Sequence, residues 1–192
     1  MLHMSQINYN ILQELMKHDI HIRGLAKSLN TNQTTTARKM REFEGLNIVD
    51  FRIEGKNKVY SVKDSIEAEE HIKIMEHAKL ITAMQKYPVI KQIAEDINSN
   101  PKIRLAILFG SYAKNKAEKN SDIDLYVETD DRKLTKEVEL INSRLSVKFG
   151  RFDTETLLAK EIIANHVIIK GVERYYELVH KKIGKGEKDK SK

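Results

Sequence analysis

The first third of the chain changes from helical to strand spacing of its apolar residues. Apolar positions repeat at helical spacing near 7–15, 22–29 and 33–44, which predicts three short helices. Two apolar runs follow at 48–53 and 58–62, separated by a short polar turn, and they predict a β-hairpin. The expected order is therefore three helices and then a hairpin.

This order resembles a winged helix-turn-helix domain, whose third helix enters the major groove of DNA while its hairpin contacts the backbone. Side chains that can donate hydrogen bonds to phosphates or base edges lie on the outer face of the third helix and in the hairpin. We expect these residues to bind DNA: Thr34, Thr35, Arg38, Lys39, Arg41, Lys56 and Lys58. The alternative is a winged helix used for protein docking or dimer contact, with an ordinary solvated helix face.

A long helix and a shorter one connect this region to the rest of the chain. The first begins after the capping pair Asp64-Ser65 and reaches about Lys86, and the second begins at Pro88. The long helix carries an apolar stripe at nearly heptad spacing: Ile74, Ala78, Ile81 and Met84. This stripe packs either against its own domain or against a partner copy, so a homodimer is one expectation.

The residues with the clearest chemistry lie in the second half of the chain. An apolar run ends at Gly110-Ser111, a polar loop follows, and a second apolar run opens with Asp122-Ile123-Asp124. Side chains two apart on a strand share a face, so the two carboxylates converge. They suit a hard cation such as Mg²⁺, which is usually shared with substrate phosphates, and the Gly-Ser turn offers N–H groups and a hydroxyl to those phosphates. This pattern predicts phosphoryl or nucleotidyl transfer.

The same segment resembles the signature of the DNA polymerase β nucleotidyltransferase superfamily, in its minimal branch. The resemblance implies a small mixed sheet, so the expected fold is α+β, with the winged helix in front. It implies that Gly110 and Ser111 bind the nucleotide, and that Asp122 and Asp124 are both the Mg²⁺ ligands and the catalytic residues. ATP is the donor that the resemblance suggests. Related minimal transferases include antitoxins that adenylylate a partner toxin, which adds a toxin-like protein acceptor to the expected partners.

One part of the superfamily pattern is not found where it is expected. Transferring members carry a third carboxylate on a later strand, where it helps to activate the attacking hydroxyl. The matching strand is expected at 145–152, where Lys148 and Gly150 hold the positions at which the resemblance implies an acid. Asp153 is the nearest acid, and it is either that third carboxylate or the cap of the next helix. Without the acid, two carboxylates still suit a metal-bound nucleotide, but a general base is missing.

Charge is unevenly spread along this chain of net charge +6. Residues 1–63 hold ten Lys/Arg and six Asp/Glu, residues 64–180 hold eighteen and twenty, and residues 181–192 hold six and two. A basic N-terminal region favours a phosphate-rich partner. The absence of cysteine excludes disulfides, and no apolar run approaches the ~18 residues that span a bilayer. We therefore expect a cytoplasmic protein with no membrane partner.

These observations predict four regions. They are a winged helix-turn-helix DNA-binding domain at 1–63, a helical connector at 64–100, a nucleotidyltransferase domain at 101–183 and a disordered basic tail at 184–192. Two functions fit this organisation. The first is an Mg²⁺-dependent nucleotidyltransferase coupled to a DNA-binding domain. The second is a transcription regulator or antitoxin whose nucleotidyltransferase-like domain binds nucleotide or a partner without catalysis.

Overall fold

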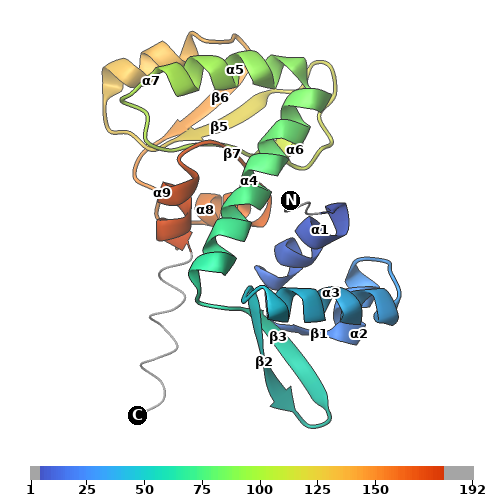
Figure 1. Ribbon diagram of the computed structural model, residues 1–192. Helices are drawn as coiled ribbons and strands as arrows, with labels where there is room; N and C mark the ends of the chain where they lie inside the picture. The colour runs from blue at the N-terminus through green and yellow to red at the C-terminus, as the bar shows by residue number, and fades with distance from the viewer. Residues whose placement is uncertain (1–4, 180–192) are drawn as a thin grey trace, which may run out of the picture. The chain divides into compact units, whose positions relative to one another are not determined.

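The computed structural model describes residues 5–179 and divides into two compact units, Met1–Met75 and Glu76–Lys192 (Figure 1). The division falls inside one long helix, α4, which runs from Ile66 to Lys86. The predicted basic tail at 184–192 and the last residues of the predicted nucleotidyltransferase domain at 101–183 lie outside the described residues. Within residues 5–179, no helix has both the length and the apolar character needed to cross a bilayer.

The first unit is a winged helix-turn-helix fold. Its elements are α1 (Gln6–Leu15), β1 (Ile20–His21), α2 (Ile22–Ser28), α3 (Gln33–Gly45), β2 (Val49–Glu54) and β3 (Asn57–Val62). The three strands form an antiparallel sheet in the order β1-β3-β2. The helices and the sheet each contribute buried side chains to the unit, among them Leu12, Leu25, Phe43 and Tyr60. The predicted helices and hairpin are therefore confirmed, with a short added strand, β1.

Local signals explain where α3 and α4 begin. The side chain of Asn32 accepts a hydrogen bond from the backbone N–H of Thr35 at 2.7 Å, which caps α3. The hydroxyl of Ser65 accepts from the N–H of Ala68 at 3.2 Å and caps α4, as predicted.

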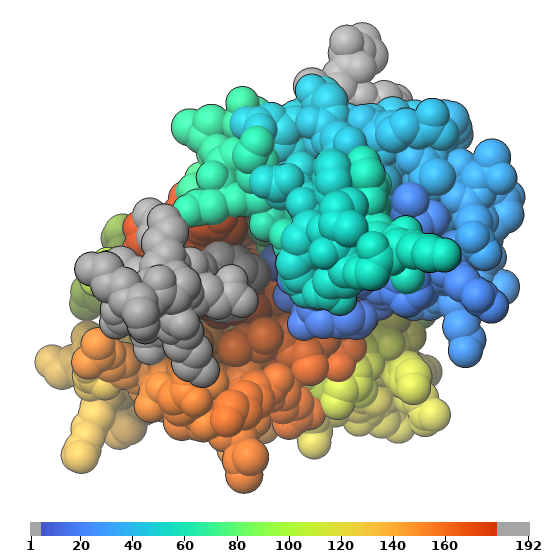
Figure 2. Space-filling model, turned by 90° about the horizontal axis from the view of Figure 1, so that it is seen from below, coloured from blue at the N-terminus to red at the C-terminus, as the bar shows by residue number. Residues whose placement is uncertain are grey.

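The hairpin of β2 and β3 is exposed at its tip and lies open on the face shown in Figure 2.

The predicted apolar stripe of α4 is only partly buried. Met84 packs against the core of the second unit, whereas Ile74 is 42% and Ile81 is 52% exposed. The buried apolar residues of the helix are others, such as Met75 and Ala83. Packing of Ile74 and Ile81 against their own domain is therefore not observed, and their use in a homodimer stays a prediction.

The second unit is built on a mixed four-stranded sheet in the order β6-β5-β4-β7. Strands β5 and β6 are parallel, and β4 is antiparallel to both β5 and β7. The elements are α5 (Pro88–Ser99), β4 (Ala106–Leu108), α6 (Gly110–Ala113), β5 (Ile123–Val127), α7 (Arg132–Glu139), β6 (Leu145–Phe149), α8 (Leu157–Ala164), β7 (Val167–Lys170) and α9 (Val172–Val179). The predicted α+β class with a mixed sheet is confirmed.

Helices cover both faces of this sheet (Figure 1). On one face, α5 and α7 bury apolar residues such as Ile93 and Leu134 against Leu125 of β5. On the other face, α8 and α9 pack with Tyr126 of β5. Because side chains alternate along a strand, Asp124 shares the face of Tyr126 and therefore lies on the α8 and α9 side.

Two boundaries after β6 differ from the prediction. The strand ends at Phe149 rather than at residue 152, because Gly150 adopts a positive φ of 138° and turns the chain out of the sheet. The cap of α8 is Thr156, whose hydroxyl accepts from the N–H of Ala159 at 3.1 Å. Asp153, which was one candidate for that cap, instead forms a turn in which its carboxylate accepts from the N–H of Glu155 at 3.1 Å.

Candidate functional site

A tight turn joins β4 to the start of α6 and brings the backbone against a carboxylate. Gly110 has a positive φ of 66°, and a Cβ placed there would overlap the Asp124 side chain. The N–H of Phe109 donates to the carbonyl of Asp124 at 2.9 Å, which holds the turn against β5. Only glycine combines this conformation with this close approach. Ser111 follows in the first turn of α6, where the backbone N–H groups have no helical carbonyl to pair with.

The two predicted aspartates come together as expected. Asp122 is exposed and directly precedes β5, and Asp124 lies partly buried in the strand. Burial raises the pKa of Asp124, and the negative charge of Asp122 raises it further. The ionised Asp124 carboxylate therefore lies in a place where a nearby cation would stabilise it.

An acid from α8 joins this group, and sequence reasoning missed it. The charge of Glu161 also raises the pKa of Asp124. Its carboxylate accepts a hydrogen bond from the ammonium of Lys114, at 3.0 Å. Lys114 caps the C-terminus of α6, close behind the Gly-Ser turn. No local signal in the sequence marks Glu161, because only the packing of α8 on the sheet brings it near.

A lysine stands where a third acid was expected. On the parallel strand β6, Lys148 pairs in register with Tyr126, and Ser146 pairs with Asp124. Lys148 therefore lies on the same face as Asp124, and its charge partly offsets the rise in the pKa of Asp124. Gly150 lies beyond the strand. Within the described part of the chain, no group of three or more Asp, Glu or His side chains could hold a metal ion.

Asp122 and Asp124 nevertheless fit a hard divalent cation that is shared with a ligand. Carboxylate oxygens are the ligands that Mg²⁺ prefers, and this ion usually takes only one or two of them from the protein. Asp124 is desolvated and faces a second carboxylate, and an ion bound between them would remove that repulsion. The remaining coordination would come from phosphate oxygens and water.

The residues predicted to bind DNA are distributed over α3 and the hairpin. Most of them are exposed, namely Thr34, Arg38, Arg41, Lys56 and Lys58, while Thr35 and Lys39 are half-buried.

Acidic neighbours already contact three of the predicted cations. Glu42 accepts from Arg38 at 3.0 Å and from Lys39 at 2.8 Å. Lys58 lies 3.7 Å from Glu44, and its ammonium is 3.5 Å from the centre of the Phe51 ring. Part of the positive charge of this surface is therefore already balanced within the unit.

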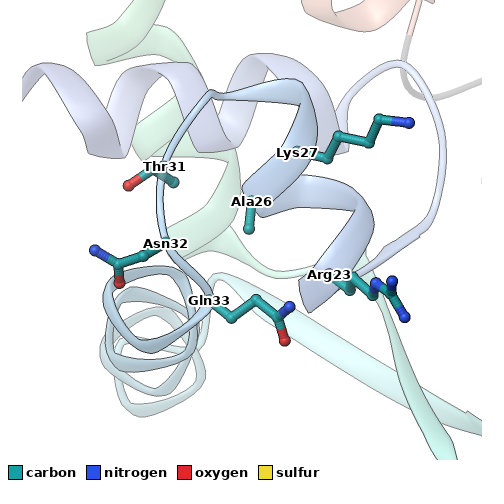
Figure 3. Close-up of a pocket in the computed structure, with 6 residues that line it drawn as sticks. All are labelled: Arg23, Ala26, Lys27, Thr31, Asn32 and Gln33. Atoms are coloured by element: carbon teal, nitrogen blue, oxygen red, sulfur yellow. The ribbon is translucent and has the colours of Figure 1, made fainter.

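Two further cations line a pocket between α2 and α3. This pocket of about 480 Å³ is lined by Arg23, Ala26, Lys27, Thr31, Asn32 and Gln33 (Figure 3). Arg23 and Lys27 project from one face of α2, and neither forms an ion pair with another of residues 5–179. The sequence reading missed them, although their spacing of four residues places both on one side of a helix.

A comparison with protein families finds a match within the second unit. Residues 91–175 match the family described as Polymerase beta, Nucleotidyltransferase. A structure of the adhesin competence repressor AdcR from Streptococcus pyogenes is 14% identical, with a TM-score of 0.34, over 50% of this chain and 78% of that one. A toxin–antitoxin structure with AMP-PNP is 22% identical, with a TM-score of 0.35, over 53% of this chain and 86% of that one. Both TM-scores are below 0.5, so neither structure supports a conclusion about this chain. No curated protein matched.

Residues 91–175 thus lie in a nucleotidyltransferase-like domain, and a winged helix-turn-helix precedes it along the chain. The Gly-Ser turn and the two aspartates lie inside the matched residues.

Proposed function

We propose that the second unit binds a nucleoside triphosphate with Mg²⁺ and transfers its nucleoside monophosphate to a hydroxyl group. ATP is the donor that we propose. The observation that carries the proposal is the contact between the Gly110 turn and the Asp124 carboxylate, because it sets the backbone N–H groups of the turn directly beside a carboxylate of the kind that binds Mg²⁺.

Each residue has a distinct task in this proposal. Asp122 and Asp124 hold the cation, which when bound neutralises phosphate charge and favours departure of pyrophosphate. Ser111 and the N–H groups at the start of α6 orient the triphosphate so that the acceptor oxygen can attack the α-phosphorus. A bond from the acceptor oxygen to that phosphorus forms as the bond to pyrophosphate breaks.

Transfer can be tested with Mg²⁺ and ATP labelled in its α-phosphate, offered with hydroxyl-bearing candidates that include proteins. We expect label on an acceptor with the wild-type chain and none with Asp124→Asn. Asp96→Asn is the matched control, because Asp96 is exposed on α5, which covers the other face of the sheet. If the folded wild-type chain transfers no label to any acceptor, the catalytic proposal is wrong.

We also propose that the first unit binds DNA, with α3 in the major groove and the hairpin on the backbone. Charge supports this, because Arg23 and Lys27 add two unpaired cations to the predicted set beside the start of α3. We expect the double variant Arg23→Ala, Lys27→Ala to weaken binding to all DNA sequences alike and to lower the salt dependence. Lys17→Ala, which removes an exposed lysine that follows the end of α1, is the control.

A specific observation favours a second function. Lys148 holds the strand position at which a third acid would assist the attacking hydroxyl, so the domain would bind nucleotide and regulate the DNA-binding unit without transfer. Titration of DNA binding with and without Mg²⁺-nucleotide separates the two functions. A change in DNA affinity with no turnover supports the regulator, and turnover supports the transferase. A homodimer fits either function, and a toxin-like protein fits the first function as an acceptor and the second as a bound partner.

A further inference from the structure

The charge around Asp124 differs from that of a site built from acids alone. Lys114 is held by Glu161 at 3.0 Å, so these two charges largely cancel. Lys148, by contrast, forms no ion pair or side-chain hydrogen bond with another of the residues from 5 to 179. What remains is a pair of aspartates and one unpaired ammonium, and Asp124 and Lys148 lie on the same face of the sheet.

The position of Lys148 is set by the sheet and does not depend on a loop. Strands β5 and β6 pair in parallel over five residues, from Ile123 with Leu145 to Val127 with Phe149. Lys148 is two pairs further along than Ser146, which lies opposite Asp124, so Lys148 and Asp124 share a face. A one-residue slip would send its side chain to the opposite face, where apolar residues pack, so the register is well specified.

An ammonium at this place changes how many divalent ions the site can hold. Enzymes that clamp a phosphoryl group with two metals hold the ions about 3.5–4 Å apart, and carboxylates and phosphate oxygens together offset their four positive charges. Here two carboxylates are available, and Lys148 adds a positive charge of its own. A second divalent ion would lack a third acidic ligand and would be repelled by the lysine.

We propose that the site binds one divalent cation for each nucleotide, and that the Lys148 ammonium takes the place and the charge of a second. This inference rests on the proposed nucleotide site. Lysine is a compact, strongly hydrated point charge that can neutralise phosphate oxygens, but it cannot bind and acidify a hydroxyl as a metal ion can. The proposal therefore describes a site that holds a nucleotide tightly with one metal ion.

The test counts metal ions directly and does not depend on turnover. Mn²⁺, whose oxygen ligands resemble those of Mg²⁺, is added with AMP-PNP to the full-length chain, and the ratio of bound Mn²⁺ to bound nucleotide is measured by electron paramagnetic resonance. We expect a ratio of one for the wild-type chain and two for Lys148→Asp. Lys91→Asp makes the same charge change on α5, over the other face of the sheet, and should keep a ratio of one.

Lys148→Met separates charge from metal ligation. It removes the ammonium without adding an acid, so we expect one Mn²⁺ and a nucleotide affinity several-fold lower than that of the wild-type chain. Lys148 is exposed, so these changes leave the core intact. Two ions in the wild-type chain, or one in Lys148→Asp, would overturn the inference and leave the nucleotide site standing. A folded wild-type chain that binds no AMP-PNP with Mn²⁺ would overturn both.

Discussion

A buried ionic cluster anchors the second half of α4 to the nucleotidyltransferase-like unit, and its strength can be predicted. Glu76 is only 1% exposed, and its carboxylate lies 3.2 Å from Nε2 of His166 and 2.6 Å from the ammonium of Lys79. The other ring nitrogen of His166 contacts the Ile162 carbonyl at 3.1 Å and the Tyr175 hydroxyl at 3.3 Å. The cluster thus joins α4, α8 and α9.

The cluster stabilises the ionised form of Glu76, and the direction of its pKa shift reflects this. Burial alone would raise this pKa, but the contacts with His166 and Lys79 outweigh burial and lower it from 4.5 to about 2. Because the unfolded carboxyl has the higher pKa, the stabilisation is fully present above pH 4.5 and is lost as the pH falls through 2. The difference in pKa corresponds to about 3 kcal/mol at pH 7 and about 2 kcal/mol at pH 3.5.

The perturbation that tests this is Glu76→Gln, which keeps the shape and removes the charge. Breaking a buried pair by removing one partner costs roughly 3–5 kcal/mol. We expect the low end of that range, about 3 kcal/mol at pH 7, because it matches the difference between the folded and unfolded pKa of Glu76. The difference in the free energy of unfolding between the wild-type chain and Glu76→Gln should be smaller at pH 3.5 than at pH 7.

Urea unfolding followed by circular dichroism at both pH values is the assay, and hydrogen exchange at pH 7 assigns the affected transition to α8, β7 and α9. Glu95→Gln is the control, because the Glu95 side chain is 67% exposed on α5. A Glu76→Gln variant within roughly 0.5 kcal/mol of wild type at pH 7, which is the range of ordinary surface changes, would refute the reasoning. A difference in the free energy of unfolding that is larger at pH 3.5 than at pH 7 would also refute it.

Gly110→Ala should lose about 1–2 kcal/mol of stability from its positive φ and, because of the overlap with Asp124, at least ten-fold in nucleotide affinity. Gly55→Ala has a similar φ of 60° in open space, so it should lose stability alone, and equal nucleotide binding in the two variants would contradict the close-approach argument. Asn32→Ala removes the cap of α3 and should lower the thermal stability of the first unit by about 1 kcal/mol, whereas no change would mean that the cap is dispensable. Glu161→Gln breaks an exposed pair and should change stability by less than about 1 kcal/mol, while Mn²⁺ affinity falls a few-fold as a nearby negative charge is lost. An unchanged Mn²⁺ affinity would show that Glu161 does not act on the site.

Much of the fold could be predicted because the signals are local. The helices of the first unit follow from apolar spacing, and the starts of α3 and α4 follow from Asn32 and Ser65, which cap them through contacts only three residues away. The convergence of Asp122 and Asp124 needs only the alternation of side chains along one strand. The predicted cap at Asp153 is wrong, because Thr156 offers the same chemistry three residues later and caps α8 instead.

The contacts that could not be predicted join segments far apart in the chain. Glu161 reaches the site from a helix that follows Asp124 by more than thirty residues, and Glu76 meets His166 across an even longer stretch. Nothing local distinguishes these acids from the other charged residues on helix surfaces. Arg23 and Lys27 could have been found from their helical spacing, but the pocket between α2 and α3 depends on how the two helices pack.

The sequence by itself determined the winged helix-turn-helix, the α+β class of the second unit and the central residues of the candidate site. All of these arise from short-range patterns: helical and strand spacing, a Gly-Ser turn, and Asp-x-Asp at the start of one strand. It also showed that Lys148 stands where an acid was expected, but it did not show which face of the sheet carries this side chain. Only the tertiary structure decided this, because the parallel pairing of β5 with β6 sets the register that places Lys148 on the face of Asp124. A charge acts on a site through distance in space, and that distance is set by packing.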